Sequence, residues 1–301
     1  MRATIQLCTY NRAALLRRVL DACFEQLVPF GSYEVVVVDD GSSDGTSEVI
    51  EVARERATCP FSVVSQRNSG LARGRNAGIE RACGERIIFI DDDVLPLPTF
   101  VAEHLRSHVA HPEAIVRGAA IATESFDDLP PPVWGLKDYS GNYFWTTNVS
   151  VPLQTIRTIG GFNESFLEYG WEDIDVGLRL RQAGVQSIFN RQALAYHYKP
   201  KLRSSDVEKL LARSRAQART AVQLACLHPH WRTYLATGDN PVQRLIHRWM
   251  RGVNAARRYR SRIGDLNGDR ELSSRESRIA RRLAAEAYFE ELERSRDRPM
   301  P

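Results

Sequence analysis

Short apolar runs and stretches of helical spacing alternate along the first 200 residues of this chain. Runs of β-branched and aromatic residues predict strands, and apolar residues that recur every three or four positions predict amphipathic helices between them. The predicted strands cover residues 3–9, 34–40, 61–65, 86–91, 115–121, 145–151, 186–189 and 193–198. Because strand and helix alternate repeatedly from the start, we predict an α/β fold with a largely parallel sheet and helices on both faces.

The pattern changes at about residue 201, where helical periodicity replaces the strands. Helices are predicted at 206–227, 242–256 and 275–296. We therefore divide the chain into an α/β domain at 1–200 and an α-helical C-terminal region at 201–301. Residues 122–144 lack a periodic pattern, and such a long loop in a compact domain is usually functional or mobile.

The composition is that of a soluble globular protein, with 43% hydrophobic and 26% charged residues among 301. No apolar run approaches the roughly 18 residues that a membrane-spanning helix needs. The N-terminus enters a strand-like pattern directly, without the apolar core of a signal peptide. The five cysteines are scattered and form no Cys-x-x-Cys pair, so we expect reduced thiols in a cytoplasmic protein.

Charge is distributed unevenly between the two regions. Beyond residue 200 lie 22 of the 41 basic and 12 of the 37 acidic residues, a net charge of +10 there against −6 in the first 200. The basic helix expected at 241–260 has two interpretations: peripheral contact with an anionic inner membrane face, or packing on the α/β domain with a solvated basic face. No nucleic-acid recognition motif accompanies this charge, so we expect no nucleic-acid partner.

Acidic clusters follow two predicted strands. The run from Arg86 to Ile90 ends in Asp91-Asp92-Asp93, and the predicted strand at 34–40 ends in Asp39-Asp40. The carboxyl ends of parallel strands line one edge of a sheet, where ligands bind. Adjacent carboxylates repel one another unless a cation compensates them, and oxygen ligands suit Mg²⁺ or Mn²⁺. The alternative for a single cluster is a solvated acidic turn.

Two further segments bear on the same edge. Residues 68–78 form a glycine-rich, arginine-bearing helix start that matches neither a dinucleotide fingerprint nor a P-loop. Glu172 and Asp173 open a predicted helix, a position that the helix dipole alone also favours for acids. Several such clusters at strand ends and helix starts favour a shared metal and nucleotide site.

Five blocks of residues occur in a fixed order over about residues 4–198. The blocks are Cys8-Thr9-Tyr10-Asn11-Arg12, Val38 to Thr46 with Asp39-Asp40-Gly41, Asn68-x-Gly70 with Arg75-Asn76-x-Gly78, Phe89-Ile90-Asp91-Asp92-Asp93, and Gly160-Gly161-Phe162 with Trp171-Glu172-Asp173-x-Asp175. Together they resemble the inverting glycosyltransferases of family 2, which have the GT-A fold. The last block also resembles the C-terminal catalytic block of galactosyl- and N-acetylgalactosaminyltransferases. Each block alone is weak evidence, and their order and spacing make the resemblance specific.

The resemblance implies a binding site for the nucleotide of a sugar donor, most often UDP. Thr9, Tyr10 and Arg12 would line the base pocket. Asp39 would accept the uracil N–H, and Asp40 would support it.

Five further positions are candidates for the donor side by resemblance. Gly70, Arg75 and Asn76 would pack against the base and the loop beside the metal. Either Asp91 or Asp92 would bind the ribose.

The resemblance also places Asp91-Asp92-Asp93 as the DxD motif. Asp93, with Asp91, would coordinate a divalent cation, Mn²⁺ or Mg²⁺, and His197 lies where relatives often supply a further ligand. A lone histidine on a strand also has a structural interpretation.

Glycosyl transfer needs a base, because the hydroxyl of an acceptor is a weak nucleophile. Asp173 is our candidate for this base, Glu172 is the second catalytic candidate and holds the acceptor, and Trp171 offers a face on which a sugar ring packs. The acceptor would be a glycan, a lipid-linked sugar or a small molecule. Two alternatives stay open: a nucleotidyltransferase, in which the block at 171–173 would be idle, and a sugar-nucleotide or glycan binding protein without catalysis.

Overall fold

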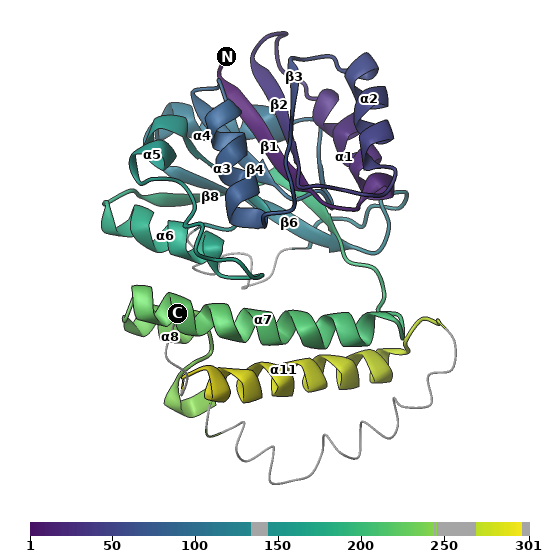
Figure 1. Ribbon diagram of the computed structural model, residues 1–301. Coiled ribbons are helices and arrows are strands. Elements are labelled where there is room, and N and C mark those ends of the chain that lie inside the picture. The colour runs from purple at the N-terminus through teal and green to yellow at the C-terminus, as the bar shows by residue number, and fades with distance from the viewer. Residues whose placement is uncertain (134–143, 244, 246–268, 297–301) are drawn as a thin grey trace. The chain divides into compact units, whose positions relative to one another are not determined.

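The computed structural model describes residues 1–133, 144–243, 245 and 269–296 (Figure 1). The chain forms two compact units. The α/β unit comprises Met1–Leu167 and Glu172–Pro200, and the helical unit comprises Glu168–Trp171 and Lys201–Pro301. The helical unit is therefore discontinuous in sequence.

Eight strands of the α/β unit form one sheet in the order β3-β2-β1-β4-β7-β6-β8-β5. The strands are β1 (Ala3–Thr9), β2 (Tyr33–Asp39), β3 (Phe61–Ser65), β4 (Arg86–Ile90), β5 (Val94–Pro96), β6 (Ile115–Thr123), β7 (Asn148–Pro152) and β8 (Ser187–Tyr198). The first four run parallel, as do β6 and β8, whereas β7 and β5 are antiparallel to their neighbours. This mixed, mostly parallel sheet confirms the predicted α/β class.

Helices cover both faces of this sheet (Figure 1). They are α1 (Ala13–Phe24), α2 (Thr46–Arg56), α3 (Leu71–Arg81), α4 (Phe100–Ala110), α5 (Leu153–Thr158) and α6 (Glu172–Gln182). Ile88 and Ile90 of β4 pack with α1, α2 and α4, while Ile87 and Phe89 pack with α3, α5 and α6. Successive side chains of a strand point to opposite faces, so a continuous apolar run is needed for two cores.

The structure differs from the predicted elements in several places. Residues 187–198 form one strand with a register shift opposite Gly118 and Ala119, where two short strands were predicted. A polar interruption at 190–192 therefore marks an irregularity within β8 and not its end. The three-residue β5 and six-residue α5 are too short for a periodicity to reveal them.

A buried polar network joins α4 to β7. His104 Nε2 lies 2.9 Å from Asn148 Oδ1, His104 Nδ1 lies 2.8 Å from Ser150 Oγ, and His108 Nε2 lies 2.8 Å from the same hydroxyl. The Asn148 amide donates to carbonyls of β6 and β8, so its oxygen accepts and His104 Nε2 carries the proton. Ser150 then donates to His104 and accepts from His108. Burial lowers the pKa of His104 to about 4 and of His108 to about 3, which keeps both rings neutral.

The helical unit contains α7 (Asp206–Leu227), α8 (Trp231–Ala236) and α11 (Ser274–Arg296). Helices α7 and α11 lie side by side (Figure 1) and run in the same direction. Their first halves share one apolar cluster around Leu211 and Leu283, and their second halves share another around Ala218 and Leu292.

The four residues of the discontinuous segment are held by α7. Trp171 donates its indole N–H to the Gln217 carbonyl at 2.8 Å and packs against the cluster around Ala218. Thr220 donates to the Tyr169 carbonyl, and Arg219 pairs with Glu168. The segment is thus fixed by hydrogen bonds, an ion pair and apolar packing.

Most of the predicted basic helix at 241–260 lies outside the described residues. Among the residues that the structure does describe, no helix is long and apolar enough to cross a membrane.

Candidate active site

The strand register brings the first candidate residues together at one edge of the sheet. Thr9 is paired with Asp39 at the ends of β1 and β2. The β1–β4 register, continued three residues, sets Thr9 opposite Asp92, and its hydroxyl donates to Asp92 Oδ2 at 2.9 Å. Asp39 Oδ1 in turn accepts the backbone N–H of Ser42 at 3.0 Å. The parallel strands therefore gather these polar groups at their carboxyl ends.

Two antiparallel pairings complete this edge. The β4–β7 pairing matches Ile90 with Asn148, so the next residue pair outward is Asp91 with Thr147, whose hydroxyl donates to Asp91 Oδ2 at 3.0 Å. The β5–β8 pairing matches Val94 with His197 and so brings this histidine beside Asp93.

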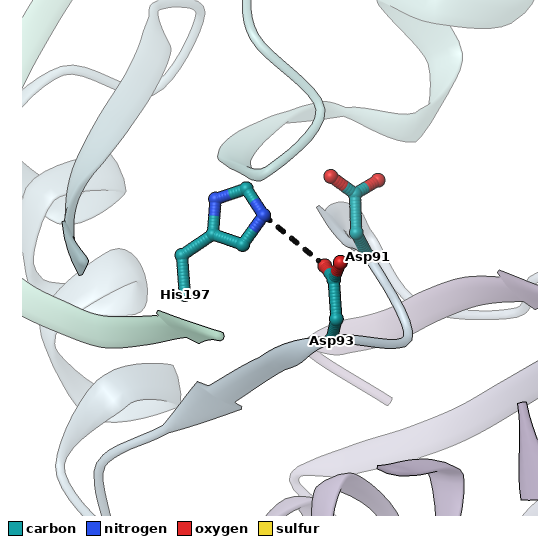
Figure 2. Close-up of side chains that lie close together, drawn as sticks. All are labelled: Asp91, Asp93 and His197. Atoms are coloured by element: carbon teal, nitrogen blue, oxygen red, sulfur yellow. Dashed lines mark ion pairs between the residues drawn. The ribbon is translucent and has the colours of Figure 1, made fainter. Parts of the chain in front are cut away.

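Asp91, Asp93 and His197 form a group whose ligand atoms lie within 4.8 Å of one another (Figure 2). His197 Nε2 lies 3.2 Å from Asp93 Oδ1, and Arg12 donates to Asp93 Oδ2 at 3.2 Å. Burial alone would raise the pKa of Asp93, but the contact with His197 and the charges of Arg12 and Lys199 outweigh it and lower this pKa. Asp93 is therefore an anionic carboxylate at neutral pH.

We call Asp91, Asp93 and His197 the cation group, because their side chains fit a divalent cation. Two carboxylates and an imidazole are donors that suit Mn²⁺ and accept Mg²⁺. Within the described part of the chain, the buried Asp93 Oδ1 makes no well-formed hydrogen bond, although His197 Nε2 is near it. A buried carboxylate oxygen without a donor is costly unless a cation satisfies it.

Asp92 differs from its two neighbours because its side chain is buried in the fold. Burial, with the charges of Asp93 and Asp91, raises its pKa to about 7 against the opposing effects of Arg12 and the Thr9 hydroxyl. The three consecutive acids are therefore not equivalent, since only Asp91 and Asp93 join His197.

Arg75 connects this edge to the second candidate cluster. Its guanidinium is buried and donates to Glu172 Oε1 at 2.5 Å and to Asp91 Oδ1 at 3.4 Å. It also lies over the Phe162 ring, 5.3 Å from the centroid. Burial lowers the pKa of Arg75, but Glu172 and Asp91 outweigh it and hold this pKa above its ordinary value. The Arg75 guanidinium therefore bridges the carboxylates of Asp91, at the end of β4, and Glu172, at the start of α6.

Asp173 follows Glu172 in the first turn of α6 and has a partly accessible side chain. The surrounding protein and the charge of Glu172 raise its pKa to about 7, against the opposing charge of Arg75 and a hydrogen bond from its own helix. A carboxyl group with a pKa near neutrality is a suitable general base.

Several other candidates hold backbone in place. Asp40 accepts the N–H groups of Ser69 and Gly70 at 2.9 and 3.0 Å, and Gly70 adopts a left-handed φ of +90° as it leads into α3. Asn76 pairs through its amide with both backbone groups of Phe162. A Cβ on Gly161 would lie 2.5 Å from the Asn76 oxygen, so glycine is required in this turn.

The remaining two candidates lie in different surroundings. Tyr10 is 48% exposed just after β1, which leaves its ring available to a ligand. Trp171 has its described contacts in the helical unit, through Gln217 and the cluster around Ala218. The structure thus links two sets of candidates by direct contacts. Arg75 contacts Asp91 and Glu172, and the Asp91–Asp93 run also contacts Thr9, Arg12 and His197. No described side-chain contact links Tyr10, Trp171, Asp39, Asp40 or Asp173 to them.

The family is decided by sequence comparison. The family described as "Glycosyl transferase family 2" matches residues 4–163, more than half of the chain. The chain belongs to glycosyl transferase family 2. A second family, described as "N-terminal domain of galactosyltransferase", matches residues 134–201.

The chain also resembles curated proteins at low sequence identity. Validoxylamine A glucosyltransferase of Streptomyces hygroscopicus is 29% identical over 62% of this chain and 52% of its own length. Poly(ribitol-phosphate) β-N-acetylglucosaminyltransferase TarS of Staphylococcus aureus is 28% identical over 44% of this chain and 24% of its own. The chain spans about half the length of the first of these relatives.

Solved structures share the fold. Mannosyltransferase PcManGT from Pyrobaculum calidifontis, in complex with GDP-Man and Mn²⁺, superposes with a TM-score of 0.62 at 17% identity, covering 96% of this chain and 87% of that one. Residues 1–349 of S. aureus TarS, in complex with UDP, give a TM-score of 0.55 at 16% identity, covering 98% and 91%. These likenesses confirm the GT-A fold.

Two residues that contribute to the site of this family 2 member are not among those predicted from the sequence. Thr147 holds Asp91, but only the antiparallel β4–β7 register reveals it. Arg179 donates to Asp175 and to the carbonyls of Ile159 and Gly161, and so fixes the glycine turn against α6. The spacing of four between Asp175 and Arg179 on one helix is the signal that could have suggested their ion pair.

Proposed function

We propose that the protein transfers a sugar from a nucleotide-sugar donor, UDP-linked in our preferred case, to a hydroxyl acceptor with inversion at the anomeric carbon. The observation that carries this proposal is the continuous arrangement from the group Asp91, Asp93 and His197, through Arg75, to Glu172. Metal-type ligands at one end and a carboxylate with a pKa near 7 beside the other are the two requirements of such a transfer.

The donor end lies at the carboxyl edge of the sheet. Thr9, Tyr10 and Arg12 line the base pocket, and Asp39 and Asp40 complete it. Gly70, Arg75 and Asn76 pack against the base and the loop beside the metal, and either Asp91 or Asp92 binds the ribose. These assignments follow from the family resemblance.

Asp93, Asp91 and His197 would hold Mn²⁺ or Mg²⁺. A cation bound there neutralises the charge that develops on the departing diphosphate.

Asp173 acts as the base. The acceptor oxygen forms a bond with the anomeric carbon while the bond from that carbon to the diphosphate oxygen breaks, and the hydroxyl proton passes to the Asp173 carboxylate. The nucleoside diphosphate leaves with the bonding electron pair. Attack from the face opposite the leaving group inverts the configuration of the anomeric carbon.

The acceptor end begins at Glu172 and Trp171, where Glu172 would accept a hydroxyl and the Trp171 face would contact a sugar ring. The proposed acceptor is a glycan, a lipid-linked sugar or a small molecule. A glucosyltransferase of validoxylamine A and a β-N-acetylglucosaminyltransferase of poly(ribitol phosphate) are among the relatives, so the family accommodates different acceptors.

Two solved structures with the same fold contain different sugar nucleotides. S. aureus TarS is solved in complex with UDP-GlcNAc, and PcManGT in complex with GDP-Man. The first experiment is therefore a panel of UDP- and GDP-sugars with Mn²⁺, in which release of nucleoside diphosphate is measured with and without EDTA. Release from at least one donor that EDTA abolishes is expected. No hydrolysis or transfer with any donor, and no sensitivity to EDTA, would contradict the proposal.

The Asp173→Asn variant separates the proposal from a binding protein without catalysis. We expect transfer to fall by about 10²- to 10⁴-fold, as for loss of a general base. Binding of the nucleoside diphosphate, measured by calorimetry, should remain. Equal function of the variant and the wild type would favour a protein that only binds sugar nucleotides or glycans.

A nucleotidyltransferase is the alternative enzyme. It would release pyrophosphate from a nucleoside triphosphate and would leave the Trp171–Asp173 block without a role. Measuring pyrophosphate with nucleoside triphosphates and a sugar phosphate distinguishes the two reactions. The buried contact between Arg75 and Glu172 favours the transferase.

A further inference from the structure

Arg75 is enclosed between groups that belong to three separate segments. Its side chain is 6% exposed, and it pairs with Glu172, which is 7% exposed, and with Asp91. The ring of Phe162, in the glycine turn, lies against its third side. A guanidinium is a planar fork with donors in fixed directions, so one arginine can hold two carboxylates at a defined separation.

Glu172 depends on this contact. Its second oxygen, Oε2, is buried and has no hydrogen-bond partner within the described ranges. Arg75 is therefore the group that compensates the buried carboxylate at the start of α6. Asp91 by contrast has a second partner, the Thr147 hydroxyl. The longer 3.4 Å contact of Arg75 with Asp91 places a positive charge beside one member of the cation group.

We propose that Arg75 is a positioning residue that joins Asp91 to Glu172 and so fixes the start of α6 relative to the cation group. The donor-binding role that family resemblance gives Arg75 is the competing assignment. This inference rests on the proposed transferase function, since it concerns the geometry of that reaction.

Two consequences oppose each other and separate positioning from donor binding. Loss of the fork should misplace Glu172 and the adjacent Asp173, which slows the chemical step. Loss of the positive charge beside Asp91 should strengthen the binding of a divalent cation, because the Arg75 guanidinium and the metal ion repel each other. A residue that only stabilises the fold would weaken both properties together.

The experiment compares Arg75→Lys, Arg75→Met and the control Arg73→Gln. Arg73 pairs with Glu164 at the surface and is 52% exposed, so its replacement should leave activity unchanged. Three quantities are measured on the full chain: Mn²⁺ affinity by electron paramagnetic resonance, UDP affinity by calorimetry, and kcat and donor KM with the donor found active for the wild type. Circular dichroism and the midpoint of urea unfolding check folding.

For Arg75→Lys, which keeps the charge but cannot hold both carboxylates, kcat should fall about 100-fold, with Mn²⁺ and UDP affinity within about threefold of the wild type. For Arg75→Met, Mn²⁺ affinity should rise several-fold while kcat falls at least as far. If Arg75→Met does not fold, the kcat and the Mn²⁺ and UDP affinities of Arg75→Lys decide the question.

A donor KM or UDP dissociation constant that rises more than about tenfold with kcat retained would overturn the inference in favour of donor binding. Weaker Mn²⁺ binding by folded Arg75→Met would also overturn it. The Mn²⁺ affinities can be measured without any turnover. A wild-type protein that transfers no sugar would therefore refute the proposed function, while the Mn²⁺ affinities of the variants would still test the role of Arg75.

Discussion

Asp173 carries an electrostatic property that can be measured directly. Its pKa of about 7 results from partial desolvation by the surrounding protein and from the charge of Glu172, against the opposing charge of Arg75. A base works only when deprotonated, so below pH 7 the carboxyl holds a proton and the base is lost.

We therefore predict that kcat rises about tenfold per pH unit below roughly 7 and becomes level above it. The measurement is a pH profile of kcat with saturating donor, acceptor and Mn²⁺. The Asp173→Asn variant should lack this limb in its residual rate. A limb near pH 4 would show that the ordinary pKa of an aspartic acid is retained.

Asp93 makes the second prediction at this scale. The Asp93→Asn variant removes the anionic ligand that both Arg12 and His197 approach, and we expect Mn²⁺ affinity to fall about tenfold or more. Asp127→Asn is the matched control, because Asp127 is 79% exposed and pairs only with a surface arginine in the described contacts. Equal loss of affinity in both variants would point to general charge and not to a ligand.

The sequence predicts which side chains gather at the candidate site better than it predicts their contacts. The acids at strand ends were found because parallel strands end at a common edge, whose position an apolar run predicts. The sequence leaves Asp92 out of the predicted metal ligands, as the structure does, but it does not indicate that Thr9 donates to Asp92 or that Asp40 accepts the N–H groups of Ser69 and Gly70. Those outcomes depend on the direction of single side chains, which the period of a strand fixes only to one face or the other.

At the scale of elements, the antiparallel β7 is the least predictable and most consequential strand. It lies between β4 and β6, and its register aligns Thr147 with Asp91. Nothing in its five residues distinguishes an antiparallel from a parallel strand. The polar network that joins it to α4 also has no sequence signature, because its histidines and serine are far apart in the chain.

That network gives a stability prediction. In Ser150→Ala, His104 Nδ1 loses its donor and His108 loses its acceptor, and both groups stay buried. We expect the free energy of unfolding to fall by about 2 to 4 kcal/mol, the cost of two unsatisfied buried groups. Urea unfolding at pH 7 measures it.

The control for that measurement is Thr158→Ala, whose hydroxyl donates to an exposed carbonyl one helical turn back. Its change should stay within about 0.5 kcal/mol. A Ser150→Ala variant as stable as this control would mean that water replaces the lost hydrogen bonds.

At the scale of the whole molecule, the helical unit is assembled from two separate segments of the chain. Glu168–Trp171 belong to the helical unit although they precede it by about 30 residues. The amphipathic pattern of α7 and α11 indicated helices but could not show that a short turn elsewhere in the chain packs with them. Such a small insertion has no periodicity of its own.

Arg219 tests this association. Its guanidinium donates to Glu168 at 2.9 Å and to Glu291 of α11 at 3.0 Å. We predict that Arg219→Met lowers the stability of the helical unit by about 1 kcal/mol, as expected for a partly exposed ion-pair network. Hydrogen exchange at the backbone of 168–171 should become faster at the same time. Unchanged exchange there would show that Trp171 and Tyr169 hold the segment without the ion pairs.

The discontinuity of the helical unit limits how this protein can be recombined. The chain passes between the units at 167/168, 171/172 and 200/201, so no single junction separates them. A hybrid gene joined at residue 200 would retain Glu168–Trp171 from one parent and receive α7 from the other. Compatible parents would need matching residues at positions such as 168, 217 and 219, and we expect these positions to be inherited together.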